Sequence, residues 1–288
     1  MAVTKTNIEW TDSTWSPIRG CSRVSEGCRY CYAETVANRF KGEGQPYEGL
    51  IAPGGQWNGK ITVARHLLDQ PLRWRQPRRV FVNSMSDLFH DNVPEYTIDC
   101  IFAVMAMAER HKFQILTKRP QRMLEYVENL RPRADLIAKA AVNHWGGADP
   151  DNLYDWVLDL INESPLANVW LGVSAEDQKT FDERVGILEK IPAAVRWVSL
   201  EPLLGPIKAT WEDISDGMVV DKFPLIDWVV VGGESGKNAR PMHLEWARSL
   251  RDQCQASGTA FFMKQMGGKN KMAMPEIPPD LMIREYPQ

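Results

Sequence analysis

The sequence predicts an α/β protein with a parallel sheet, in the form of a full or partial (β/α) barrel. Six short apolar runs rich in Val, Ile, Leu and Phe recur along the chain, which is typical of strands that are buried on both faces. Helical patterns separate these runs, as in α/β folds. A doubly wound sheet also fits this alternation, but polar residues follow nearly every run, which favours a barrel. The runs begin at Arg79, Lys112, Asn168, Arg196, Asp227 and Thr259.

The candidate helices lie between or after these runs, at Glu95–Arg110, Arg119–Leu130, Glu176–Lys190 and Leu244–Ser257. Pro94 and Gly258 are favourable flanking residues for the first and the last of them. The stretch Ser16–Gly20 is a candidate first strand, which brings the total to about seven βα units. Residues 131–167 form a candidate helical insertion between the third and fourth strands. We therefore expect one barrel domain over residues 1–288 with this insertion.

Two stretches depart from the regular alternation. Lys208–Pro224 is irregular and stands where a helix is expected. The tail from Pro275 is rich in proline, which favours an extended conformation.

Composition narrows the class of protein. The hydrophobic content of 44% is enough for a sizeable core, and the net charge of −3 gives no overall basic field for nucleic acid. The N-terminal residues lack the apolar run of a signal peptide, and no stretch approaches about 18 consecutive apolar residues. An odd number of cysteines argues against a secreted disulfide framework. We expect a cytoplasmic protein without a membrane span.

Three cysteines lie close together near the N-terminus: Cys21, Cys28 and Cys31. Three thiolates can hold an iron–sulfur cluster and leave one iron without a protein ligand. They can also hold zinc if a fourth ligand comes from elsewhere in the chain. Candidates for that fourth ligand are His66, His90 and Cys100. Cys100 and Cys254 lie in helical stretches and are expected to be packing cysteines.

Polar residues at the ends of the predicted strands are candidate site residues, because function in α/β barrels concentrates at the carboxyl ends of the strands. Glu201 and Lys264 stand at the end of, or within, apolar runs, so they must be paired or used. We expect them to contact substrate or cofactor; a structural ion pair is the alternative. Gly232 and Gly233 lack a Cβ, which allows a ligand to approach the backbone closely. The wider set is Asn83, Ser84, Ser86, Asp87, Lys118, Ser174, Glu176 and Glu234.

The cysteine loop resembles the cluster loop of radical S-adenosylmethionine (AdoMet) enzymes. Those enzymes usually have the spacing C-x3-C-x2-C, whereas this chain has C-x6-C-x2-C. Tyr30 precedes the last cysteine, where that superfamily often packs a ring against adenine. The whole chain is also similar to a phage- and bacteria-associated family of unassigned function. The strings that carry this similarity are NIEWTDSTWSPIRGCSRVSEGCRYCYAE, FVNSMSDLFH, ILTKRP, NVWLGVSAEDQ, VSLEPLLGP, VVVGGESG and FFMKQMGG.

The resemblance implies a barrel of the radical-AdoMet type. Cys21, Cys28 and Cys31 would bind a [4Fe–4S] cluster, and AdoMet would bind at its open iron. Asn83–Asp87 would hold the amino group of AdoMet, and Ser174 with Glu176 would face its ribose or methionine part. Gly232–Glu234 would line the far strands. An electron donor would reduce the cluster, and a 5′-deoxyadenosyl radical would take a hydrogen atom from a substrate that the resemblance does not identify.

Two basic strings favour a nucleotide or nucleic-acid substrate, because basic side chains contact phosphates whatever the overall charge. They are RWRQPRR at Arg73–Arg79 and KRPQR at Lys118–Arg122. A solvated loop is the alternative interpretation of the first string. The rival function is a non-catalytic, zinc- or cluster-stabilised, phage-associated binding protein.

Overall fold

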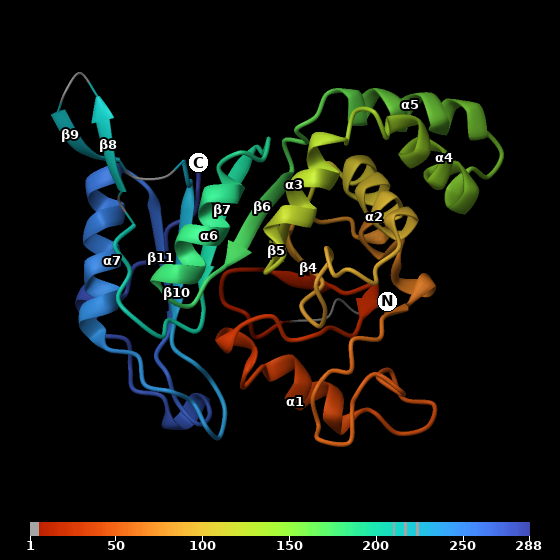
Figure 1. Ribbon diagram of the computed structural model, residues 1–288. Coiled ribbons are helices and arrows are strands. Elements are labelled where there is room, and N and C mark those ends of the chain that lie inside the picture. The colour runs from red at the N-terminus through yellow and green to blue at the C-terminus, as the bar shows by residue number, and fades with distance from the viewer. Residues whose placement is uncertain (1–5, 210, 216–217, 223–224) are drawn as a thin grey trace. The chain divides into compact units, whose positions relative to one another are not determined.

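The structure is a computed structural model that describes residues 6–288 apart from 210, 216–217 and 223–224 (Figure 1). Its main sheet has seven strands in the order β1-β4-β5-β6-β7-β10-β11. Strand β1 pairs with β4, β4 with β5, β7 with β10 and β10 with β11, all in parallel. The strands are β1 (Ser13–Trp15), β4 (Arg79–Val82), β5 (Lys112–Thr117), β6 (Val169–Ser174), β7 (Val195–Leu200), β10 (Trp228–Gly232) and β11 (Ala260–Gln265).

The prediction of an α/β fold with a parallel sheet is confirmed. All six predicted apolar runs form strands of this sheet. Strands β1 and β11 are its two edges, and the strands between them follow one another in chain order, as in a partial barrel and unlike the reversed order of a doubly wound sheet. The helices predicted between the runs are α2 (Glu95–Met107), α3 (Pro120–Glu128), α6 (Gln178–Leu188) and α7 (Leu244–Ser257). In the part of the chain that the structure describes, no helix is long and apolar enough to cross a membrane.

Two compact units make up the chain, and each is described by itself. Unit 1 consists of Met1–Ser22, Ala33–Leu171 and Ile191–Ala194. Unit 2 consists of Arg23–Tyr32, Gly172–Lys190 and Val195–Gln288. The chain passes from unit 1 to unit 2 within the cysteine loop and again within β6. The expectation of one domain stays a prediction.

Unit 1 is built on β1, β4 and β5 with the helices that pack beside them. Helix α2 is buried continuously from Thr97 to Met107. A helix that is apolar all round needs cover on several sides. Here α4 (Ala134–Trp145) and α5 (Pro150–Asn162) provide part of that cover, and both lie in the 131–167 stretch (Figure 1). Unit 1 also contains α1 (Tyr32–Arg39) from its second residue onward.

Unit 2 is built on β7, β10 and β11, with α7 packed beside β11 (Figure 1). Val229 pairs with Val198 on one side and with Phe261 on the other, so three apolar residues lie in register across the middle of this sheet. Two indole rings, those of Trp197 and Trp228, pack with their centroids 5.2 Å apart. Helix α7 ends at Gly258, whose φ of 73° is the left-handed conformation that favours glycine.

The first strand is displaced from its predicted position. The prediction was Ser16–Gly20, but β1 ends at Trp15 and the next strand, β2 (Ile18–Arg19), leaves the main sheet. It pairs instead with β3 (Thr62–Val63) in a separate two-stranded sheet. Pro17 separates β1 from β2, and a proline cannot donate a ladder hydrogen bond. The chain therefore leaves the main sheet at Pro17, and Gly20, the residue before Cys21, forms only an isolated parallel bridge with Ser86.

The two irregular stretches take different forms. Lys208–Pro224 contains a hairpin of β8 (Trp211–Ser215) and β9 (Met218–Lys222), although part of this stretch lies outside the described residues. The C-terminal tail runs along β11, where Met263 N donates to Ile283 O at 2.9 Å and Glu285 N donates to Phe261 O at 3.0 Å. The tail therefore covers the edge of the sheet in unit 2.

A buried ion pair joins α2 to the segment before α4 within unit 1. Arg133 Nη2 donates to Asp99 Oδ2 at 2.8 Å, and Arg133 Nε donates to Asp99 Oδ1 at 3.1 Å. The hydroxyl of Tyr126 donates to the same Oδ1 at 2.8 Å. Only 3% of the Asp99 side chain is exposed. Burial and the Asp99 carboxylate raise the pKa of Tyr126 well above its ordinary value of 10.0, so this hydroxyl stays a donor.

Replacement of Arg133 by Met is expected to lower the free energy of unfolding by about 2 to 3 kcal/mol, because it leaves the Asp99 carboxylate buried without a cation. The measurement is urea unfolding followed by tryptophan fluorescence. Lys139→Met is the matched control, since it removes an exposed pair with Asp135 and should leave the midpoint unchanged. Equal midpoints for wild type and Arg133→Met would contradict the prediction.

Candidate functional site

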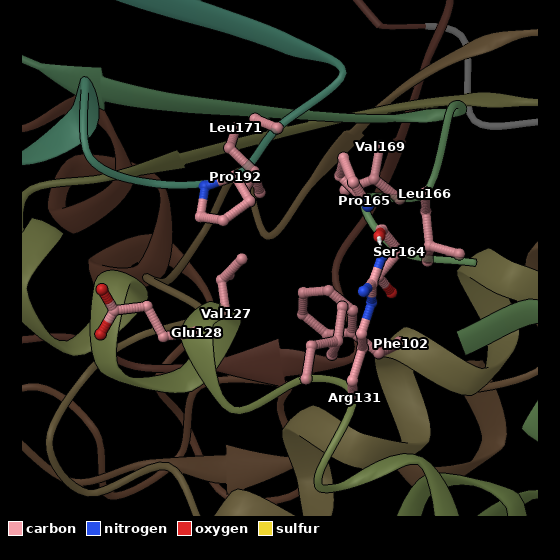
Figure 2. Close-up of a pocket in the computed structure, with 12 residues that line it drawn as sticks. Phe102, Val127, Glu128, Arg131, Ser164, Pro165, Leu166, Val169, Leu171 and Pro192 are labelled. Carbon is pink, nitrogen blue, oxygen red and sulfur yellow. Dashed lines mark hydrogen bonds between the residues drawn. The ribbon is translucent and has the colours of Figure 1, made fainter. Parts of the chain in front are cut away.

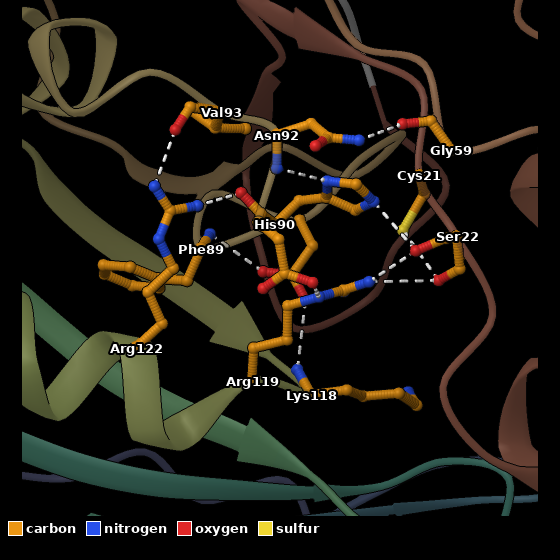
Figure 3. A network of polar contacts seen from close by, with 12 residues as sticks. Cys21, Ser22, Gly59, Phe89, His90, Asn92, Val93, Lys118, Arg119 and Arg122 are labelled. Carbon is orange, nitrogen blue, oxygen red and sulfur yellow. Dashed lines mark hydrogen bonds and ion pairs between the residues drawn. The ribbon is translucent and has the colours of Figure 1, made fainter.

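A polar network that includes Ser22, Lys118 and Arg119 lies in unit 1 (Figure 3). The Asp87 carboxylate is its centre and joins the ends of β4 and β5. Its Oδ1 accepts from Thr117 Oγ1 at 2.7 Å and from Phe89 N at 3.0 Å. Its Oδ2 accepts from Lys118 N at 3.2 Å and from Arg119 Nη1 at 3.0 Å. The side chains of Asp87 and Arg119 are each only 8% exposed. The carboxylate is thus fully used in holding two strand ends together.

Arg119 connects this network to the first cysteine. Its Nη2 donates to Ser22 Oγ at 2.8 Å and to Ser22 O at 3.3 Å. The Cys21 thiol donates to the same Ser22 carbonyl at 3.5 Å, so the guanidinium and the sulfur share one acceptor. Burial opposes the charge on Arg119, but Asp87 and the Cys21 thiolate raise its pKa above the ordinary value. A permanent positive charge therefore lies beside Cys21.

His90 is held by hydrogen bonds at both ring nitrogens (Figure 3). Asn92 N donates to Nδ1 at 3.1 Å, so the ring proton lies on Nε2, which donates to Ser22 Oγ at 2.8 Å. Burial and the nearby Arg119 lower the pKa of His90 below its ordinary value of 6.5. Because Nε2 and Nδ1 are both used, His90 has no nitrogen left to serve as a fourth zinc ligand in this arrangement.

Residues 83–86 hold the segment that precedes Cys21. Ile18 N donates to Asn83 Oδ1 at 3.3 Å, and Ser86 Oγ donates to Ile18 O at 2.9 Å. The hydroxyls of Ser84 and Ser16 lie 3.2 Å apart. Asn83 has a φ of 61°, the left-handed conformation that asparagine tolerates better than most residues. Its Nδ2 is buried and has no hydrogen-bond partner among the described residues, which leaves both N–H donors of this amide available.

The Glu176 carboxylate anchors the second part of the cysteine loop in unit 2. Its Oε1 accepts from Gly27 N at 3.1 Å, and its Oε2 accepts from Arg184 Nη1 at 3.1 Å. A Cβ on residue 27 would lie 2.9 Å from that Oε2, so the contact requires glycine. Arg184 Nη1 also donates to Ser174 O at 2.5 Å. Glu176 is completely buried, and its oxygens are occupied by the protein's own donors.

Glu234 and Arg240 hold the same part of the loop from the end of β10. Arg240 Nη2 donates to Glu234 Oε1 at 2.7 Å and to the Glu26 carbonyl at 2.9 Å. The hydrogen bond to Glu234 raises the pKa of Arg240 above its ordinary value. The Tyr30 ring contacts two cations: the guanidinium carbons of Arg240 and Arg29 are 5.4 Å and 5.5 Å from its centroid. These cation–π contacts hold the ring that was predicted to contact adenine.

Glu201 and Lys264 come together at the ends of β7 and β11. Lys264 Nζ lies 2.7 Å from Glu201 Oε1, and Ser199 Oγ donates to Glu201 Oε2 at 3.0 Å. The side chains of Glu201 and Lys264 are 13% and 20% exposed, so the pair is largely but not wholly desolvated. The contact is an ion pair, as the structural interpretation expected. Part of both groups remains accessible, and contact with substrate or cofactor stays a prediction.

Internal packing accounts for the two glycines at the end of β10, Gly232 and Gly233. A Cβ on Gly232 would lie 2.8 Å from Glu201 Oε1. A Cβ on Gly233 would lie 2.2 Å from the backbone nitrogen of Gly267. The space that these glycines leave is therefore filled by the protein itself. A role in cofactor binding stays a prediction for both.

The three clustered cysteines are free thiols and are all partly exposed: Cys21, Cys28 and Cys31. Cys21 belongs to unit 1, whereas Cys28 and Cys31 belong to unit 2. Among the described residues, no three His, Cys, Asp or Glu side chains are already gathered as a metal site. Cys100 and Cys254 are buried, and burial raises the pKa of their thiols to about 11 and about 12. Both are packing cysteines, as expected.

Sequence reasoning missed the residues that pair with the strand-end carboxylates. Arg184 lies on α6 and Arg240 in a loop, and nothing in the local sequence marks either as a partner. Arg119 was noted only as part of a basic string. A usable signal was Gly27, because a glycine beside a cysteine indicates close approach by another group.

The two basic strings are mostly engaged within unit 1. Arg73 pairs with Asp69, and Arg79 Nη2 lies 3.0 Å from Asp12 Oδ1. In the second string, Arg119 is buried in the Asp87 network, and Arg122 donates to backbone carbonyls at His90 and Val93. These contacts favour structural roles for both strings over phosphate binding.

A cavity of about 330 Å³ lies elsewhere in unit 1, beside the start of β6 (Figure 2). Its lining is mainly apolar, and Arg131 Nη2 donates to Ser164 O at 2.6 Å along one wall. The apolar side chains include Phe102, Val127, Leu130, Leu166, Val169 and Leu171. None of the residues predicted as a site lines this cavity, so it is separate from the strand-end groups.

The fold and these contacts define an α/β protein with a three-cysteine loop that strand-end side chains hold within each unit. The chain belongs to the family described as "Protein of unknown function (DUF5131)", whose match covers residues 5–286. This agrees with the predicted similarity to a family of unassigned function. Among curated proteins, no match to this chain was found.

The chain is also similar to solved structures of spore photoproduct lyase. A mutant of that enzyme with one cysteine replaced by serine has 12% sequence identity and a TM-score of 0.41, over 92% of this chain and 60% of the other. A double mutant with bound AdoMet and dinucleoside spore photoproduct has 11% identity and a TM-score of 0.40, over 91% and 59%. The chain thus spans about 60% of the length of these structures.

Replacement of His90 by Gln is expected to lessen the loss of thermal stability in acid. The folded-state pKa of His90 is lowered, so its contribution is full above the ordinary value of 6.5 and is lost as pH falls below it. The measurement is the change in melting temperature between about pH 7.5 and pH 5.5. The change should be smaller in His90→Gln than in wild type, while the control His66→Gln, at an exposed position, should match wild type. An unchanged acid response in His90→Gln would refute the assignment.

Proposed function

We propose that this chain is an iron–sulfur enzyme of the radical-AdoMet type. The observation that carries the proposal is the cysteine loop: three free, partly exposed thiols with a final C-x2-C spacing and no disulfide among them. Three thiolates match the ligand set of a cluster that keeps one iron open. The rival, a closed zinc site, needs a fourth ligand: of its three candidates Cys100 is buried and His90 is already bonded at both nitrogens, which leaves the exposed His66.

In this proposal Cys21, Cys28 and Cys31 hold a [4Fe–4S] cluster and AdoMet binds at its open iron. When bound and reduced by an electron donor, such a cluster would supply one electron to AdoMet; the C5′–S bond would then break to give methionine and a 5′-deoxyadenosyl radical, which would take a hydrogen atom from substrate. The protein's part is to hold the thiolates, orient the ligands and exclude water.

The buried charges around the loop support these positioning roles. In unit 1, Arg119 places its charge beside Cys21 and is itself fixed by Asp87. A cation beside a thiolate favours the deprotonated form that binds metal. In unit 2, Glu176 fixes Gly27, the residue before Cys28. We assign Asp87 and Glu176 to positioning the loop, because their oxygens are occupied by protein donors.

Two of the remaining predicted residues have capacity for a ligand. The buried Nδ2 of Asn83 is a donor, so it suits the carboxylate of AdoMet better than the amino group that the resemblance assigned to this stretch. Tyr30 offers an aromatic ring held by Arg29 and Arg240. The other predicted cofactor-binding residues are proposed to support Asn83 and Tyr30 through the backbone at the strand ends. They are Ser84, Ser86, Lys118, Ser174 and Glu234.

Glu201 and Lys264 are the proposed substrate- or cofactor-contacting pair. With Lys264 Nζ and Glu201 Oε1 2.7 Å apart, the pair places a proton donor, the ammonium group, beside a proton acceptor, the carboxylate. Because the two charges neutralise each other, neither is buried alone. The substrate class that we propose is a nucleotide or nucleic acid. Its support comes from the exposed cations Lys237 and Lys269 of unit 2, since the two basic strings are mostly engaged within unit 1.

Anaerobic reconstitution should give wild-type protein with about four irons per chain and a broad visible absorption. Cys21→Ala, Cys28→Ala and Cys31→Ala should each abolish it, because each removes one of three ligands. Cys100→Ala and Cys254→Ala are the controls and should keep it. Iron retained in the triple variant would refute the cluster, and a colourless protein with one zinc per chain would support the binding-protein alternative.

The Glu201–Lys264 pair can be tested with a double-mutant cycle. Lys264→Met should lower the free energy of unfolding by about 2 kcal/mol, since it leaves a largely buried carboxylate, and the added Glu201→Gln should restore most of that loss. AdoMet affinity and release of 5′-deoxyadenosine per folded molecule should stay low in the double variant if the pair contacts ligand. A double variant with wild-type stability and wild-type AdoMet affinity and turnover would restrict the pair to a structural role.

A further inference from the structure

The tripeptide Gly-Lys-Asn occurs at the ends of both β10 and β11 in unit 2. It is Gly236-Lys237-Asn238 after the first strand and Gly268-Lys269-Asn270 after the second. The backbone joins the two loops: Gly236 N donates to Gly268 O at 3.1 Å, and Gly268 N donates to Glu234 O at 2.9 Å. The two lysines therefore follow directly after two hydrogen-bonded glycines.

Each loop is fixed from a second side. Gly236 has a φ of 123°, a conformation that L side chains rarely adopt. In the first loop, Glu234 accepts from Arg240 N at 2.8 Å. In the second, Asn270 Oδ1 accepts from Ala273 N at 2.9 Å. The glycines and these bonds hold the loops, while Lys237 and Lys269 are both exposed.

The charges at this edge of unit 2 leave these two lysines in excess. Glu176 pairs with Arg184, Glu201 with Lys264 and Glu234 with Arg240. By contrast, Lys237 and Lys269 make no ion pair with any residue that the structure describes. Although the net charge of the chain is −3, the two adjacent loops thus carry two exposed lysines without an ion-pair partner beside the paired charges. Such a surface suits an anion.

We propose that Lys237 and Lys269 bind successive phosphate groups of a single nucleic-acid strand. Lysine binds phosphate as a point charge and without sequence preference. The cations stand on two separate loops, which suits two phosphates of an extended backbone better than one compact anion. The inference rests on the proposed function only for the claim that this strand is the substrate.

The test is fluorescence anisotropy with a fluorescein-labelled single strand of about 16 nucleotides, as DNA and as RNA. Binding to full-length reconstituted protein is measured between about 50 and 200 mM salt. The variant Lys237→Gln/Lys269→Gln should bind more weakly and should reduce the slope of log affinity against log salt by about 1.4. The control Lys179→Gln/Lys190→Gln carries the same charge change at exposed positions of unit 2 and should match wild type.

Each outcome separates the possibilities. An unchanged slope in Lys237→Gln/Lys269→Gln, or an equal loss in the control, would overturn the phosphate site. Competition by a nucleoside triphosphate as strong as by the oligonucleotide would also overturn it, because a compact anion would then be the ligand. Iron content is measured for every variant. If the protein binds the oligonucleotide but no iron after reconstitution, only the proposed function is refuted. If the lysine variant keeps four irons and its slope of log affinity against log salt is unchanged, only this inference is refuted.

Discussion

A carboxylate buried at the end of a parallel strand must be paired with a cation, and much of what surrounds the cysteine loop follows from this constraint. Asp87 is paired with Arg119, Glu176 with Arg184 and Glu234 with Arg240. An unpaired charge at such depth would cost several kcal/mol. In each case a member of the pair also bonds the loop: Arg119 through Ser22, Glu176 through Gly27 and Arg240 through Glu26. The energetic need to neutralise buried charge therefore also fixes the backbone on which the thiols stand.

Six of the seven strands of the main sheet could be predicted from the sequence, whereas the first was predicted at a displaced position. Continuous Val, Ile, Leu and Phe runs such as Val229–Val231 are buried on both faces and have few other solutions. The first strand differs from its predicted position because Pro17 interrupts the strand between Trp15 and Ile18. The prediction used hydrophobicity, which does not take into account that proline lacks the backbone N–H needed for strand pairing. Helix existence followed from periodicity, while ends shifted by a few residues, as Arg110 against Met107 shows.

The candidate site divides in the same way. Residue types at strand ends could be found from the sequence, since charges next to apolar runs are conspicuous. Their partners could not, because an arginine eight residues beyond Glu176 is not distinguishable by sequence from any other surface arginine. Gly232 and Gly233 illustrate the limit: the absence of a Cβ was interpreted as room for a ligand, whereas the groups that approach them in the structure are Glu201 and Gly267. Close approach alone does not say what approaches.

The C-terminal tail has a consequence for association. Strand β11 is an edge of the main sheet, and an exposed edge is a template on which a strand of another molecule can add. Here the backbone of Ile283 and Glu285 forms hydrogen bonds with the backbone of Met263 and Phe261. In addition, Trp228 Nε1 donates to Glu285 O at 2.9 Å. Proline residues in the same tail are poor strand partners in turn. The tail therefore covers the edge of the sheet, and two copies of the chain could pair through β11 only after the tail had been displaced from it.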